Sequence, residues 1–343
     1  MAAHLETPFK APVVDRLSVR VLVDSAYERF MLKGGHEFCS IEHVGRVPDR
    51  QMTTLACEWG LSLHLESVAA GHGAQYVLDF GYTPDIISRN FQLVDIDPGK
   101  IDGLILSHAH RDHYGGLEGF VERFRHHMPE EVSFYIGGEG VFRERWTKGA
   151  NGEIIGLGAP GRTKLTAQKV KPVVCEAPRD LGGAFSTGYI ERESFENVTG
   201  GSLVEEGAEE GAGEKAEDHF SEEERRGKLV KDTHPEEHAT CFIVQGRGLV
   251  VISSCGHTGI VNTVNMAKAV TNVEKVHAVI GGFHLGTAPD DYIAHTVQAF
   301  KDFDADVILP MHCTGARFIE ALRRAMPEKL VTTNVGSRFT FGA

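Results

Sequence analysis

The chain reads Ser107-His-Ala-His-Arg-Asp-His113 directly after the apolar stretch Ile101-Asp-Gly-Leu-Ile-Leu106. Three imidazoles and one carboxylate therefore fall within six positions. Neutral imidazoles and carboxylates are the nitrogen and oxygen ligands that Zn²⁺, Fe and Mn accept in proteins. Because a short loop after a buried strand can turn such side chains toward one point, the spacing predicts a metal-binding loop.

The same spacing divides the four side chains into two pairs. His108 and His110 are two residues apart, so on extended backbone they face the same side. Asp112 and His113 follow one turn on and can reach a second point nearby. The string therefore predicts two adjacent metal ions. The alternative to a metal site is that these are ordinary polar loop residues, because a lone histidine is more often structural or solvated. A cluster of this kind favours metal binding.

The composition is that of a globular protein. Of 343 residues, 41% are hydrophobic and 24% are charged, and the six cysteines are scattered, so we expect reduced thiols. The N-terminus lacks a basic region followed by an apolar run, and no apolar stretch is long enough to span a bilayer, which predicts a cytoplasmic protein. The formal charge of −13 argues against generic binding to nucleic acid or anionic membranes.

Much of this acidity is local. Between Gly201 and Arg225, ten acids stand against two bases in a tract with almost no large apolar residues. Such a segment cannot bury enough surface to offset the entropy lost on ordering. We therefore predict one domain over 1–343 with a flexible acidic insertion at 200–232. A lid or a partner-binding arm is the alternative for this insertion.

Apolar periodicity predicts the surrounding elements. Alternation favours strands at 17–23 and 61–66, followed by a third at 75–81 that contains Asp79 and ends in a glycine turn, so we expect an antiparallel start. After the histidine loop, Leu117, Phe120, Val121 and Phe124 recur at helical spacing and predict a helix that continues until Pro129 stops the pattern.

Three apolar strands in the last third, at 248–252, 276–280 and 306–309, each precede a glycine-rich loop with a histidine. In layered α/β sheets, the loops at strand ends converge on one rim, where sites are built from distant sequence. We therefore expect these histidines to join the loop at 108–113. As candidate metal ligands, His312 ranks first, His257 second and His284 third.

These features make the chain resemble the metallo-β-lactamase superfamily. The resemblance rests on the string from His108 to His113, the preceding Asp79 and the late histidine loops. The sequences Cys255-Gly-His-Thr-Gly259, Gly281-Gly-Phe-His-Leu285 and Met311-His-Cys-Thr-Gly315 look like a narrower branch, the 7,8-dihydropterin-6-methyl-4-(ribofuranosyl)aminobenzene-5′-phosphate synthase-like proteins. The likeness spans most of the chain.

The resemblance implies an α/β fold, a four-layer αββα sandwich with a two-metal site at one edge of the paired sheets. Asp79 would orient the histidine loop. Two divalent ions are implied as cofactors, with Zn²⁺ favoured over Fe or Mn. The implied ligands are His108 and His110 for the first metal, and Asp112, His113 and His312 for the second.

One departure concerns the bridging aspartate that the superfamily usually carries after the strand at 248–252. Cys255 stands near that place, and His257 follows two residues on. Thiolate and imidazole both suit zinc. We favour His257 as a metal ligand and keep Cys255 as a lesser candidate, because a buried free cysteine is commonly a small apolar filler. His284 is also a lesser candidate ligand, or else a proton donor.

The expected function is a binuclear metal-dependent hydrolase of a small ester, lactone, phosphoester or related substrate, in which Asp112 orients the nucleophile while ligating. One alternative is a pterin-type synthase that joins an aromatic acceptor to a phosphorylated or pterin electrophile. Another is a non-catalytic metal-binding sensor. The expected partner is a small-molecule substrate, not nucleic acid or membrane, and a homo-oligomer is left open.

Overall fold

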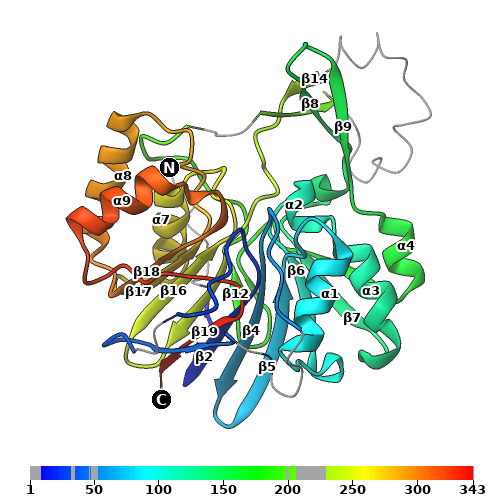
Figure 1. Cartoon of the computed structure of the whole chain (residues 1–343), viewed down its shortest axis with the longest axis horizontal. Coiled ribbons are helices and arrows are strands. Elements are labelled where there is room, and N and C mark those ends of the chain that lie inside the picture. Colours follow the sequence, from blue (N-terminus) through cyan, green and yellow to red (C-terminus); the bar gives the residue numbers. More distant parts are fainter. Residues whose placement is uncertain are drawn as a thin grey trace.

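The computed structural model describes residues 9–31, 35–45, 47, 53–197, 201–205 and 229–342. Two large sheets pack face to face, and helices cover the outer face of each (Figure 1). The fold is therefore the α/β four-layer sandwich that the resemblance implies. Among the helices of these residues, none has both the length and the apolar character needed to cross a bilayer.

The first sheet starts with the antiparallel strands predicted from alternation. β2 (Arg16–Val23) pairs with β4 (Ser62–Ala69), which pairs with β5 (His72–Leu78). β6 (Gly103–Leu106) then runs parallel to β5, so the carboxyl ends of both strands lie at one edge. The full order is β10-β7-β6-β5-β4-β2-β19-β3, with β3 at Ser40–His43, β7 at Val132–Ile136, β10 at Val170–Val174 and β19 at Ser337–Gly342.

The second sheet contains the three late strands, all parallel. β16 (Gly248–Ser253) pairs with β17 (Val276–Gly281), which pairs with β18 (Val307–Pro310). Their carboxyl ends therefore share one edge, as expected. The order is β11-β12-β15-β16-β17-β18, with β11 at Arg179–Asp180, β12 at Phe185–Ser186 and β15 at Thr240–Val244, and β1 (Val13–Val14) pairs with β15.

Buried apolar side chains fill each boundary between layers. The two sheets meet in a cluster that includes Leu63 and Ile280, both fully buried. Phe120 of α3 belongs to the cluster under the first sheet's helices, and Phe300 and Phe318 belong to the one under the second sheet's helices. The helices are α1 (Pro84–Leu93), α3 (Leu117–Phe124) and α4 (Arg162–Ala167) on the first sheet, and α7 (Ile260–Thr271), α8 (Asp290–Phe303) and α9 (Ala316–Ala325) on the second.

A third, four-stranded sheet stands above the sandwich in Figure 1. Its order is β14 (Leu229–Lys231), β13 (Ser202–Glu205), β8 (Arg145–Lys148) and β9 (Ile154–Gly158). The predicted flexible insertion at 200–232 differs from the structure at both ends, because β13 and β14 pair there through short apolar stretches that flank the acidic tract. The middle of this insertion, 206–228, lies outside the described residues.

His64 of β4 gives the sandwich a pH-sensitive element away from the strand ends. Its side chain is buried against Gln75, 3.1 Å from Nε2 to Oε1, and burial lowers the pKa of His64 to about 4. The unfolded chain binds this proton near pH 6.5 and the folded chain only near pH 4, so the stability that neutral His64 contributes is lost as the pH falls from about 6.5 to about 4. This loss amounts to about 3 kcal/mol.

We therefore expect His64→Gln to make the free energy of unfolding less dependent on pH in this window, measured by urea denaturation at several pH values. His72→Gln on the exposed end of β5 is the matched control and should keep the wild-type dependence. Equal pH profiles for His64→Gln and wild type would show that His64 does not contribute.

Candidate metal centre

The loop after β6 and the short helix α2 (Arg111–Tyr114) carry the first four predicted side chains. His108 and His110 lie in the extended segment before the helix, and their ring centroids are 4.9 Å apart. Asp112 and His113 lie on α2. The backbone of this region is held by its neighbours, since Phe80 N donates to His113 O at 2.6 Å and Leu61 N donates to Asp112 O at 3.2 Å.

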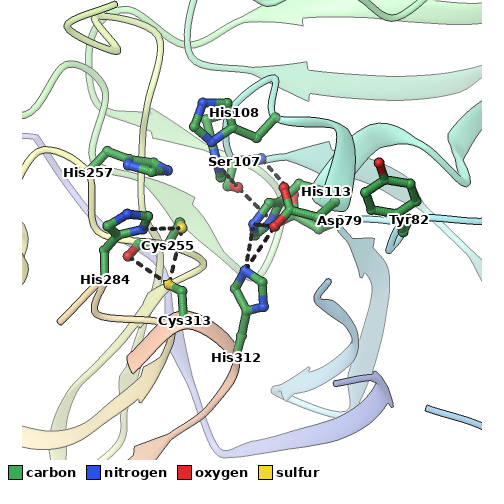
Figure 2. A network of polar contacts seen from close by, with 12 residues as sticks. Asp79, Tyr82, Ser107, His108, His113, Cys255, His257, His284, His312 and Cys313 are labelled. Carbon is green, nitrogen blue, oxygen red and sulfur yellow. Dashed lines mark hydrogen bonds and ion pairs between the residues drawn. The ribbon is translucent and has the colours of Figure 1, made fainter. Parts of the chain in front are cut away.

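Asp79, at the end of β5, is fully buried and fixes this loop (Figure 2). Its Oδ1 accepts from Ser107 N at 2.8 Å, and its Oδ2 accepts from Ser107 Oγ at 2.8 Å and from His113 Nδ1 at 2.7 Å. Because the Ser107 hydroxyl donates to Asp79, it can only accept from His108 Nδ1, 2.9 Å away. In its neutral form each imidazole therefore carries its proton on Nδ1, which leaves a free electron pair on Nε2 for a metal.

His257 completes a first group of three imidazoles. It follows β16, and the ligand nitrogens of His108, His110 and His257 all lie within 4.8 Å of one another. Glu237 holds the loop that carries His257, because its carboxylate accepts from His257 N at 2.9 Å and from Thr258 N at 2.6 Å. This set could hold one metal ion.

His312 completes a second group. Its Nε2 lies 3.2 Å from His113 Nε2 and 3.3 Å from Asp112 Oδ2, and the two rings point toward each other in Figure 2. Asp24 positions the backbone of His312 by accepting from its N–H at 3.0 Å. His312 has a left-handed backbone with φ of 49°, which is uncommon for a non-glycine residue and indicates that its surroundings hold it.

Cys255 lies between the two groups. Its Sγ falls within 4.8 Å of ligand atoms of His108 and His113, and likewise of His257 and His284. Cys313, from the loop after β18, places its own Sγ 3.2 Å from Cys255 Sγ. Glycine at position 282 permits this approach, since a Cβ there would meet Ser254 O at 2.4 Å and Cys313 Sγ at 2.8 Å.

His284 lies beside Cys255, on the same side of the site as His257 (Figure 2). Its Nδ1 is 3.2 Å from Cys255 Sγ, and its ring centroid is 4.2 Å from that of His257. All the side chains predicted for the site, from both halves of the chain, therefore meet at one edge of the two sheets.

Sequence comparison matches residues 67–261 to the metallo-beta-lactamase superfamily, a range that includes the histidine loop and His257. The chain belongs to the metallo-β-lactamase superfamily. A relative from Methanocaldococcus jannaschii, named 7,8-dihydropterin-6-methyl-4-(beta-D-ribofuranosyl)-aminobenzene-5′-phosphate synthase, is 30% identical over 291 residues, which cover 80% of this chain and 90% of the relative. An uncharacterized protein of the same organism is 26% identical over 72% of this chain and 81% of its own length.

The fold comparison agrees with the sequence comparison. A crystal structure described as a metal-dependent hydrolase of the beta-lactamase superfamily superposes with a TM-score of 0.66. It is 21% identical, and the match covers 94% of this chain and 98% of the other. This likeness shows that the two proteins share the metallo-β-lactamase fold.

The residues of this metallo-β-lactamase-fold protein fit a metal ion. Nε2 of His108 is fully buried without a hydrogen-bond partner among the described residues, which is costly unless something binds it. Two ligand atoms about 2.0–2.1 Å from a tetrahedral ion lie roughly 3.4 Å apart. The 3.2 Å and 3.3 Å separations around His312 Nε2 are close to this value.

The electrostatics of the two groups differ. Burial, together with the neighbouring imidazoles, lowers the pKa values of His108 and His110 well below the usual value, so both are neutral and ready to ligate. Burial alone would lower the pKa of His113, but the carboxylates of Asp112 and Asp79 outweigh it and raise that pKa to about 9. Burial alone would raise the pKa of Asp112, but His113 and His312 lower it, so Asp112 is ionised.

His234 was not predicted from the sequence as a residue of the site. Its side chain is buried, its ring stacks on that of His257 with centroids 4.2 Å apart, and its centroid is 4.8 Å from that of His110. Burial and nearby cations lower its pKa well below the usual value. A signal was present in the spacing of Asp232 and His234 just before a buried strand, but the acidic tract next to them was interpreted as an insertion.

Proposed function

We propose that this protein is a metal-dependent hydrolase of a small-molecule ester, lactone or phosphoester. The observation that carries the proposal is the meeting of two three-ligand groups at one sheet edge, with Cys255 between them. A small molecule, not a nucleic acid, is the partner we propose, because the chain is acidic overall, with a formal charge of −13.

The first group would hold one metal ion through His108, His110 and His257, and the second would hold another through Asp112, His113 and His312. Zn²⁺ suits this set because imidazoles and carboxylates are among its preferred ligands. When bound, such ions lower the pKa of a water ligand toward neutrality and stabilise the negative charge that develops on the substrate.

The protein's own side chains would orient the attacking water and protonate the leaving group. Asp112, ionised and next to His312, would orient the attacking water by accepting a hydrogen bond from it. Burial alone would lower the pKa of His284, but Cys313 outweighs burial and raises that pKa, which favours the proton-donating form. His284 would then protonate the leaving group, and Asp79 would keep the histidine loop in place.

The test is turnover by the purified protein, first stripped of metal and then reloaded with two equivalents of Zn²⁺. We expect it to hydrolyse bis(4-nitrophenyl) phosphate or at least one member of a lactone panel, and to lose and regain this activity when the metal is removed and restored. His126→Ala, on the exposed turn after α3, is the control and should behave like wild type. Two bound zinc ions without turnover of any of these substrates would refute hydrolysis.

A synthase is the second candidate, favoured by the name of the 30% identical relative. The product in that relative's name joins a pterin methyl group to an aminobenzene. A reaction of that class would combine a phosphorylated hydroxymethyl-dihydropterin with the aminobenzene and release the phosphate group. Mass spectrometry of the joined product, with the released phosphate measured in parallel, separates this candidate from hydrolysis. Metal binding without either reaction would favour the third hypothesis, a non-catalytic metal-binding sensor.

A further inference from the structure

An exposed tryptophan lies against the second ligand group. The ring of Trp59 is 4.8 Å from that of His312, centroid to centroid, and yet 55% of Trp59 is exposed. A single exposed apolar side chain is ordinary, but an exposed aromatic ring beside converging polar side chains is typical of a ligand site. Tyr82 and Phe195 are also exposed aromatic residues, but Tyr82 contacts Arg111, and the ring of Phe195 contacts Tyr292 and His295, outside the imidazole cluster.

The chain on both sides of Trp59 is tied to the site. Just before it, Glu58 accepts from Tyr82 N at 2.9 Å and from Thr83 N at 2.9 Å. These two hydrogen bonds hold the loop that leads into α1. Just after it, Gly60 has φ of 138°, and a Cβ there would meet Asp112 O at 2.5 Å. The backbone of Trp59 therefore follows the position of the metal-binding loop.

This anchoring matters because a side chain on a fixed backbone loses less conformational entropy when a ligand stacks on it. One part of the indole contacts His312, and the exposed part is available to a second ring. Aromatic side chains that stack on planar ligands of this kind contribute affinity without requiring a particular pattern of hydrogen bonds.

From this geometry we infer that Trp59 is a stacking platform for a planar aromatic or heteroaromatic ring of the substrate, held beside the second ligand group. The inference rests on the proposed function, since it names the substrate class of the same site. Trp59 acts as a positioning residue: it would place the ring so that the group bonded to it reaches Asp112 and His312.

The chain offers its own fluorescent reporter, because it has two tryptophans and the other, Trp146, is 4% exposed on β8. In Trp146→Phe, only Trp59 emits. In Trp59→Phe, only Trp146 emits, which corrects for light absorbed by the ligand. The probes are 6-hydroxymethylpterin and adenosine 5′-monophosphate, with ribose 5-phosphate as the ligand that lacks an aromatic ring.

We expect saturable quenching of Trp146→Phe by at least one of the two ring probes, none by ribose 5-phosphate, and only unsaturable attenuation in Trp59→Phe. By calorimetry with the same ring probe, Trp59→Leu should raise Kd about tenfold, whereas Trp59→Phe should stay near wild type. Leucine fills space beside His312 but cannot stack, so a merely structural role predicts equal Kd values for these two variants. Tyr82→Ala is the control for loss of an exposed aromatic and should bind like wild type.

Absence of saturable quenching by both ring probes in Trp146→Phe, or equal Kd values for Trp59→Leu and Trp59→Phe, would overturn the inference. Either failure is distinguishable from failure of the proposed function, because hydrolysis by the wild-type protein is measured separately with substrates that include non-aromatic lactones.

Discussion

Asp112→Ala is expected to lower kcat/KM by about a thousandfold or more, because metal ions supply several kcal/mol of stabilisation to the transition state. Asp112 Oδ2 lies 3.3 Å from His312 Nε2, so the variant loses one ligand of the second group. Plasma emission spectrometry should show fewer than two metal ions per chain, while circular dichroism should remain that of the wild type, because the side chain lies at the sheet edge and outside the apolar core.

His110→Ala should act in the same way on the first group. His126→Ala, which removes an exposed histidine, tests whether loss of any histidine abolishes metal binding and activity. It should keep both the metal and the activity. Wild-type turnover by purified Asp112→Ala or His110→Ala would contradict the mechanism.

Asp79→Asn is expected to weaken metal binding about 10- to 100-fold, the usual effect of removing a carboxylate that orients a histidine ligand. Asp79 Oδ2 accepts from both Ser107 Oγ and His113 Nδ1. An amide nitrogen at that position is itself a donor, so it could not accept these two hydrogen bonds. His113 would then lose the constraint that keeps its Nε2 free for the metal. Competition with a chromogenic chelator measures the affinity.

The matched control for this change is Asp85→Asn, at the exposed start of α1, where the side chain is 88% exposed. It removes the same charge without touching the site and should bind metal like wild type. Unchanged affinity in Asp79→Asn would mean that the histidine loop holds its geometry without this carboxylate.

Much of this arrangement could be predicted from local sequence. The spacing of His108, His110, Asp112 and His113 identifies a ligand loop because the chemistry lies within six residues. The late strands were predictable for a similar reason, since each is a short apolar run that leads into a loop containing glycine and histidine. The parallel pairing of β16, β17 and β18 then explains why the loops of His257 and His312 meet.

What could not be predicted depends on contacts between distant segments. Cys255 and Cys313 touch although 58 residues separate them, because their loops follow strands that flank β17. His234 reaches His257 because it follows the strand β14 of the third sheet, which forms only when 202–205 pairs with 229–231 across the acidic tract. Composition describes that tract as a whole and therefore conceals the ordered strands at its ends.

The most direct test of the central claim is a crystal structure of the zinc-loaded protein with anomalous scattering measured at the zinc edge. We expect two peaks, one about 2.0–2.3 Å from nitrogens of His108, His110 and His257, and one at similar distances from ligand atoms of Asp112, His113 and His312. A single peak elsewhere, or His257 and His312 turned away from the loop at 108–113, would contradict it.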